Sequence, residues 1–139
     1  MSTIRRQSLL TQRCQQSIAS IVTFNALNGE PNIMNKPSFP ITFTGLEFGT
    51  FRLKTGASET DMLAAAKSME DEFLNREEGF LGHAILKGND GTYVDLAFAT
   101  SQAKAEEICG RWMQNPHALA FLEFIDHTST NIGFWTRLQ

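Results

Sequence analysis

One segment of this chain restricts its possible folds more than any other, because it has the pattern of two strands joined by a tight turn. Residues 80–87 and 92–100 are rich in apolar, aromatic and β-branched side chains, which favour strands. Residues 88–91, Gly-Asn-Asp-Gly, tolerate the positive φ angles of a tight turn. We therefore predict an antiparallel hairpin here, with a helical pattern on each side of it.

Length and charge limit what the chain can be. Its 139 residues, 42% of them hydrophobic, suffice for one globular domain with its own core. The net charge of −3, from 12 basic and 15 acidic residues, gives no basic field for general nucleic-acid binding. Residues 1–29 contain three arginines and no acidic residue. We expect a short basic arm on an acidic body, and no nucleic-acid partner.

The two cysteines, Cys14 and Cys109, are too few and too far apart for a disulfide framework or a metal site. This favours a reducing, cytoplasmic location. No apolar run approaches the roughly 18 residues that a membrane span needs, so no membrane association is expected. The arginine pair before residues 18–27 leaves an export or transit segment as the alternative.

Prolines divide the chain into an arm and a domain. Pro31, Pro37 and Pro40 each remove a backbone donor and favour extended geometry before them. We predict an N-terminal arm and linker over residues 1–40 and a compact domain over residues 41–139.

The domain has the pattern of four strands and two helical regions. Strands are predicted at 41–54 and at 130–138, the latter after a connection at 126–129. Ser58 has the form of a helix N-cap, and Gly79 is expected to end that helix. Ser101 can cap a second helix, and Asn115 followed by Pro116 can start a further helical segment. The expected buried stripes are Met62, Ala66, Met69 and Phe73 in the first helix and Ala105, Ile108, Cys109 and Trp112 in the second.

This β-α-β-β-α-β order predicts an α+β ferredoxin-like fold with an antiparallel sheet whose helices cover one face. The strand sides expected against the helices are those of Val94, Leu96 and Phe98 and of Ile132, Phe134 and Leu138. The free face is expected to carry Thr50, Arg52, His83, Tyr93, Asp95, Asn131, Trp135 and Arg137. Such a mixed face is either solvated or shared with a partner.

Four motifs, at 51–56, 79–82, 87–95 and 112–116, resemble the dimeric α/β-barrel superfamily and within it the antibiotic-biosynthesis-monooxygenase-like proteins. The resemblance covers about residues 46–138. It implies a homodimer in which two sheets pack through their free faces, and a pocket for a small hydrophobic or aromatic ligand. Activities in this superfamily include cofactor-independent oxidation of quinol-like aromatics, haem degradation, and isomerase or lyase chemistry, and many members have no established activity.

Two departures from the family pattern narrow the expected activity. Leu122 stands where haem-degrading relatives carry their iron-binding histidine, and the asparagine expected in the first strand is missing. Haem degradation is therefore not expected. Phe98 and Ala99 replace a polar or aromatic pair found in relatives at the end of the third strand, which argues against direct transfer of their mechanism.

His83 and Asp95 are the predicted catalytic residues. A neutral imidazole beside a carboxylate on the adjacent strand can act as a general base on a phenol or enol, with Asp95 orienting it. The alternative is a cross-strand polar pair that stabilises the hairpin or a dimer by under about 1 kcal/mol.

Five further residues are predicted to bind substrate: Arg52, Trp112, Phe121, Trp135 and Arg137. The arginines can hold an anionic oxygen, or form interfacial ion pairs with Asp95 or Glu47. Trp112 and Phe121 can line an aromatic pocket or belong to the core, and Trp135 can line a pocket or anchor a dimer. No metal-ligand spacing and no phosphate-binding loop occurs, so no cofactor is predicted. The predicted function is a cofactor-independent, monooxygenase-like enzyme for a small aromatic or enolic substrate. The alternative is a non-catalytic ligand-binding or dimeric interaction module.

Overall fold

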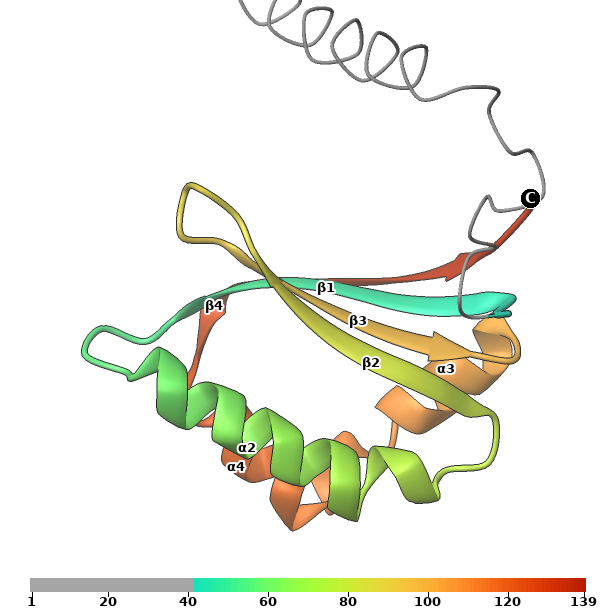
Figure 1. Ribbon diagram of the computed structural model, residues 1–139, viewed down its shortest axis with the longest axis horizontal. Helices are drawn as coiled ribbons and strands as arrows, with labels where there is room; N and C mark the ends of the chain where they lie inside the picture. The colour runs from blue at the N-terminus through green and yellow to red at the C-terminus, as the bar shows by residue number, and fades with distance from the viewer. Residues whose placement is uncertain (1–41) are drawn as a thin grey trace, which may run out of the picture. The chain divides into compact units, whose positions relative to one another are not determined.

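A four-stranded antiparallel sheet with its helices on one side makes up the domain (Figure 1). The computed structural model describes residues 42–139, and the predicted arm, residues 1–40, lies outside them. The elements are β1 (Gly45–Leu53), α2 (Glu59–Glu72), the 3-10 turn η2 (Leu74–Arg76), β2 (Phe80–Lys87), β3 (Tyr93–Ala99), α3 (Gln102–Cys109), the 3-10 turn η3 (Trp112–Gln114), α4 (Pro116–Leu122) and β4 (Ile125–Thr136). The strand order β2-β3-β1-β4 is that of the predicted ferredoxin-like fold. Within this range no helix has the length and apolar character to cross a membrane.

The three predicted helix starts are confirmed by their N-caps. The Ser58 hydroxyl accepts a hydrogen bond from the Asp61 amide at 3.2 Å, and Ser101 accepts one from the Lys104 amide at 3.0 Å. The Asn115 side chain accepts from two amides of α4, whose first residue is proline. Each cap satisfies amides that have no partner inside the helix.

The first helix ends earlier than predicted. It stops at Glu72, and the chain tightens into η2, whereas Gly79, with φ +82°, leads into β2. Phe73 and Leu74 are both buried although they are neighbours in sequence. Phe73, with φ −127° and ψ −69°, is no longer helical, so the helix ends here and Leu74 is buried from the following 3-10 turn.

The last strand begins earlier than predicted, at Ile125. The expected turn does form, but inside the strand: the Asp126 carboxylate accepts hydrogen bonds from the amide and hydroxyl of Thr128 at 3.0 and 2.7 Å. The pairing with β1 consequently jumps, since Thr50 lies opposite Asn131 while Arg52 lies opposite Asp126.

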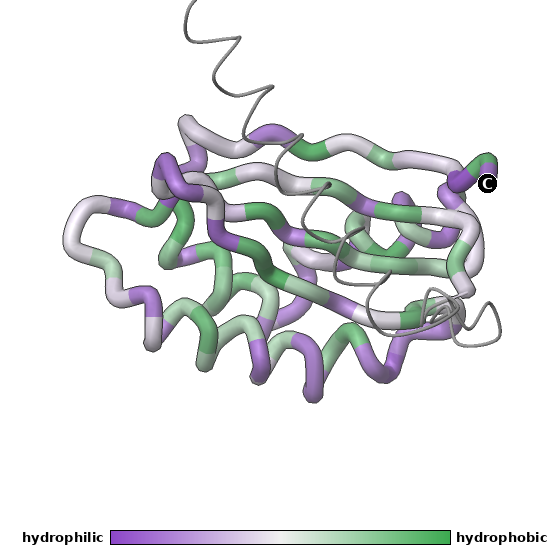
Figure 2. The backbone as a smooth tube through the Cα atoms, turned by 45° about the horizontal axis from the view of Figure 1, so that its top comes forward, coloured by the Kyte–Doolittle hydropathy of each residue, from purple (hydrophilic) through white to green (hydrophobic). Residues whose placement is uncertain are grey.

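The assignment of sheet faces was wrong for β2 and β3. Tyr93, Asp95 and His83 lie on the helix side, and Val94, Leu96 and Phe98 lie on the free face. Hydrophobic residues occur along much of the strands (Figure 2), and in β3 the free-face residues Val94, Leu96 and Phe98 are more hydrophobic than Tyr93 and Asp95 on the helix side. Hydropathy therefore favoured the wrong face. The helix side instead carries small residues where a helix comes close: a Cβ on Gly45 would lie 2.0 Å from the Ser101 carbonyl.

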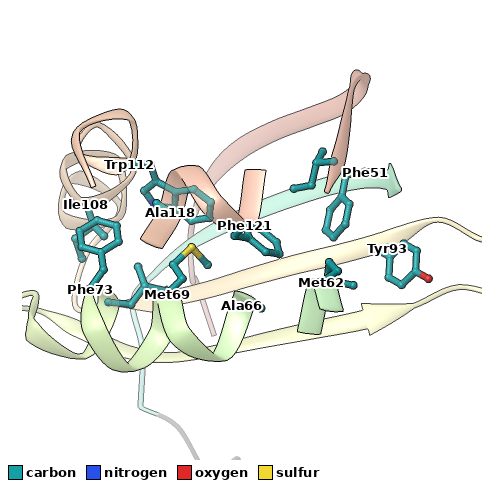
Figure 3. Packing of buried hydrophobic residues seen from close by; sticks show 12 residues of the cluster. Phe51, Met62, Ala66, Met69, Phe73, Tyr93, Ile108, Trp112, Ala118 and Phe121 are labelled. Atoms are coloured by element: carbon teal, nitrogen blue, oxygen red, sulfur yellow. The ribbon is translucent and has the colours of Figure 1, made fainter. Parts of the chain in front are cut away.

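The core lies between the sheet and the helices (Figure 3). The predicted stripe of α2 is buried, as are Ala105, Ile108 and Trp112 of the second stripe, while Cys109 is only partly buried. The Phe51 and Tyr93 rings stack at 5.3 Å, and Phe121 meets Phe51 and Trp112 edge-on at 6.0 and 6.1 Å. These ring contacts join β1 and β3 to α4.

Candidate functional site

Two predicted residues, His83 and Asp95, meet beneath the sheet. His83 of β2 lies opposite Ala97, and Asp95 of β3 lies opposite Ile85, so the two are diagonal neighbours on the helix side. The His83 Nε2 atom is 2.9 Å from the Asp95 Oδ1 atom. Their side chains are only 3% and 9% exposed. The pair therefore lies in the interior rather than on the solvated face that the sequence predicted.

A helix supplies a third charge. The Glu70 carboxylate of α2 lies 3.6 Å from the other ring nitrogen of His83, Nδ1. Burial alone lowers the pKa of His83, but the hydrogen bond to Asp95 and the charges of Asp95 and Glu70 more than offset it, so the pKa lies above its usual value. The imidazolium form is favoured in this position over a wider pH range than in water.

Glu47 is the second buried acid on the helix side, and it is 4% exposed. Burial, together with the negative charge of Asp95, raises the pKa of Glu47 to about 7, against the smaller effects of a hydrogen bond with Cys109 and the charge of His83. Burial, followed by the charge of Glu47, raises the pKa of the Cys109 thiol to about 12. The thiol thus stays protonated and can donate to the carboxylate.

Glu47 and Asp95 both line a small cavity between the sheet and the helices. Its volume is about 30 Å³, which is room for about one water molecule. The remaining wall is mostly apolar, and its residues are Gly49, Thr50, Phe51, Trp112, Phe121, Leu122, Ile125, Thr130 and Ile132. Ile132 is 49% exposed, so the cavity approaches the surface beside β4. Polar groups that converge in an apolar hollow define a candidate ligand site, and this one would have to widen to admit a molecule larger than water.

Trp112, one of the residues that line this cavity, carries an unpaired donor. Its side chain is 7% exposed, and its Nε1 atom has no hydrogen-bond partner, the single such case among buried side-chain nitrogens and oxygens of residues 42–139. An unsatisfied buried donor costs about 1–3 kcal/mol. An acceptor oxygen brought within reach of this atom would remove that cost.

His83 faces a different hollow. A groove of about 180 Å³ runs between α2 and β2, lined by Leu63, Ala66, Lys67, Glu70, His83, Ala84 and Ile85. It shares no residue with the cavity at Trp112. Asp95 connects the two, because it lines the cavity and contacts His83.

Comparison with known proteins gives matches by structure. No protein-family model and no curated protein sequence matches this chain. SnoaB, a cofactor-independent oxygenase from Streptomyces nogalater, superposes with a TM-score of 0.56 and 19% identity over 70% of this chain and 96% of its own. A proposed antibiotic biosynthesis monooxygenase from Nitrosomonas europaea gives a TM-score of 0.52 and 15% identity over 68% of this chain and 99% of its own. The protein Rv0793 from Mycobacterium tuberculosis gives a TM-score of 0.51 and 17% identity over 68% of this chain and 95% of its own.

The chain has the fold of the antibiotic-biosynthesis-monooxygenase-like proteins. This confirms the ferredoxin-like fold that the sequence predicts. At 15–19% identity the likeness concerns the fold alone, and the activity must follow from the chemistry of the site.

Within this fold, Trp112 and Phe121 lie together on the cavity wall, but three predicted ligand contacts lie elsewhere. Arg52 points away from the cavity and binds Asp90 of the hairpin turn, with its Nη1 atom 3.0 Å from the Asp90 carbonyl oxygen. Trp135 is 59% exposed on the free face. The Arg137 guanidinium lies over the Phe43 ring and donates to the Gln139 carbonyl. Their role in substrate binding stays a prediction.

Sequence reasoning did not select Glu47 and Cys109 as site residues. The sequence did contain a signal for Glu47, because Glu47 lies on the same buried side of the strand as Gly45, Gly49 and Phe51. A charged residue within such a row breaks the binary pattern, and such breaks concentrate at functional sites. Among the described residues no group of three or more His, Cys, Asp and Glu side chains is arranged to hold a metal ion.

Proposed function

We propose that this protein is a cofactor-independent, monooxygenase-like enzyme acting on a small aromatic or enolic substrate. The observation that carries the proposal is the cavity itself, in which two buried carboxyl groups and Trp112, whose N–H has no partner, line a mostly apolar hollow. Aromatic walls fit an aromatic ring, and the N–H fits its oxygen. The fold shared with SnoaB, a cofactor-independent oxygenase, supports the reaction class.

The chemistry proposed for the site begins with removal of a proton. The cluster around His83 and Asp95 takes up the proton of a phenol or enol, with His83 as the base that finally holds it and Asp95 holding the His83 ring. The resulting electron-rich anion reacts with dioxygen directly, so the proposal assigns no cofactor. Since the pKa of His83 is raised, activity should increase with pH above the usual histidine range.

A second candidate function is a ligand-binding or dimeric interaction module without catalysis. The observation that favours it is that the imidazole already has carboxylates at both nitrogens, as a purely structural histidine would. The cavity also has room for only about one water molecule before any side chain moves.

A homodimer through the free sheet face is part of this proposal. That face carries an apolar row consisting of Leu46, Phe48, Ala84, Leu86, Val94, Leu96 and Trp135. Phe48, Leu86 and Trp135 are 36%, 52% and 59% exposed. Contiguous exposed apolar side chains of this kind mark interaction sites. Arg52, on the same face, is positioned to take part in such an interface.

Oxygen uptake with a panel of dihydroxyaromatic compounds tests the proposed function. The wild type should consume oxygen with at least one of them, and His83→Ala should reduce the rate by about 10²-fold or more, which is typical for loss of a general base. Glu78→Gln, a change at an exposed carboxylate, serves as the control. If the wild type shows no uptake on any compound, the binding module becomes the better account; if His83→Ala is unaffected, the assigned base is wrong.

A further inference from the structure

The carboxyl groups that a ligand in the Trp112 cavity would contact are not those of the groove in which His83 lies. Glu47 and Asp95 line this cavity, whereas His83 lines the separate groove beside α2. A ligand placed against Trp112 and Phe121 therefore reaches carboxyl oxygens first. His83 is reached only through its contact with Asp95, at 2.9 Å.

We propose that Glu47 is the proton-exchanging residue of this cavity: it takes the proton of a bound phenol or enol directly, and the Asp95–His83 pair then carries that proton towards the groove at Glu70. This inference rests on the proposed function and names the residue that acts first in it. It also applies if the protein only binds such ligands.

The surroundings of Glu47 suit this task. Asp95 from β3 and His83 from β2 act on it with opposite charges, and Cys109 of α3 forms a hydrogen bond with it. Glu70 of α2 lies near the other ring nitrogen of His83. The residues opposite Glu47 on the neighbouring strands, Phe134 and Ala97, carry no charge. With a pKa of about 7, the Glu47 carboxyl can both accept and return a proton near neutral pH.

The proton transfer balances without an oxidant. The ligand O–H bond breaks as an O–H bond forms on the Glu47 carboxylate, and the ligand keeps the electron pair as a phenolate. Trp112 Nε1–H is available as a hydrogen-bond donor to that oxygen. Glu47 and Asp95 occupy diagonal positions on β1 and β3, where Glu47 lies opposite Ala97 and Gly49 lies opposite Asp95. From Asp95 the proton passes to the Nε2 atom of neutral His83, and the Nδ1 atom faces Glu70.

A chromophoric phenol reports this step without any oxygenation. We would bind 4-nitrophenol, whose phenol and phenolate forms absorb differently, near pH 7, where Glu47 is half ionised. Its methyl ether, 4-nitroanisole, has no proton to give and controls for changes of environment. The wild type should show a bound phenolate band that Glu47→Gln reduces about tenfold and that Glu78→Gln, a change at an exposed carboxylate, retains. Any other pattern, including a wild type without the band, overturns the proposal.

The wild-type chain gives a second test that does not depend on the folding of a variant. The carbon NMR signal of the Glu47 carboxyl can be assigned through its backbone. Its chemical shift should titrate near pH 7 and should change on addition of 4-nitrophenol but not of 4-nitroanisole. A carboxyl that titrates in the ordinary range, or that ignores the phenol, contradicts the assignment.

Failure of this inference is distinguishable from failure of the proposed function. A phenolate band that requires Glu47, without oxygen uptake on any substrate, retains the inference and removes the enzyme. Oxygen uptake that requires His83, with a phenolate band indifferent to Glu47→Gln, retains the enzyme and removes the inference.

Discussion

The Glu47 carboxyl group is buried near Asp95, where its ionised form is disfavoured. Its pKa of about 7 in the fold lies above the ordinary value of 4.5, so the fold favours the protonated form. The stabilisation is complete below pH 4.5 and is lost as the pH rises through 7. The raised pKa of His83 acts in the same direction: its contribution is present below the usual histidine range and is lost as the pH rises through the folded value.

Glu47→Gln should therefore stabilise the protein at alkaline pH. Glutamine resembles the protonated acid and cannot ionise, so the free energy of unfolding above pH 7 should rise by up to roughly 3 kcal/mol. Below pH 4.5 the variant and the wild type should differ little. Urea unfolding at a series of pH values measures this. An unchanged pH dependence in Glu47→Gln would show that the carboxyl is ionised in the fold at an ordinary pKa.

The sequence predicted the pairing of His83 with Asp95, but it did not predict that Glu47 and Cys109 lie near this pair. His83 and Asp95 belong to one hairpin, and hairpin geometry brings residues of neighbouring strands together at short range. Glu47 reaches them from β1 and Cys109 from α3, elements that are distant in sequence. Such contacts depend on which sheet face the helices cover, and that face was assigned wrongly for β3.

Strand β1 packs very closely against the start of α3 at Gly45, where there is no room for a side chain. A Cβ at Gly45 would lie 2.0 Å from the backbone carbonyl of Ser101, whereas a Cβ at Gly49, on the same strand side, would have its nearest neighbour at an ordinary 3.7 Å. Backbone cannot move aside as a flexible side chain can. The residue at position 45 therefore limits how near α3 lies to the sheet.

Gly45→Ala should destabilise the domain by about 2–3 kcal/mol, because α3 must shift to accept the methyl group. Gly49→Ala is the matched control and should change stability by less than about 1 kcal/mol. Thermal unfolding followed by circular dichroism compares the two. Equal melting temperatures for the two variants would mean that α3 is free to move away from β1.

The capping residues made the helix starts predictable from the sequence. Which face of each strand the helices cover was harder to predict, because it depends on the pairing of strands that are distant in sequence. Ser58, Ser101 and Asn115 act locally, and each marked a helix start correctly. Alternation in β3 pointed to the wrong face, because the covered side carries Tyr93 and Asp95 while the free side carries Val94, Leu96 and Phe98. The embedded turn at Asp126 likewise hid the true start of β4.

For the whole molecule, the apolar row on the free sheet face supports the proposed homodimer. Trp135→Glu should give a monomer, because a buried unpaired carboxylate in an interface is strongly disfavoured. Leu138→Glu, which adds the same charge beyond the end of β4 at a fully exposed side chain, is the control. Light scattering at micromolar concentration gives the mass. A wild type with the 15.5 kDa mass of one chain would remove the dimer from the account.

The two tryptophans of the chain allow a direct measurement of whether the cavity at Trp112 is a ligand site. In ¹⁵N-labelled protein the indole N–H groups of Trp112 and Trp135 give two signals, which Trp112→Phe assigns. We predict that hydroquinone, added without oxygen, shifts the Trp112 signal saturably as its Nε1–H gains an acceptor, while the Trp135 signal stays in place. A Trp112 signal that does not move at any ligand concentration would contradict the account.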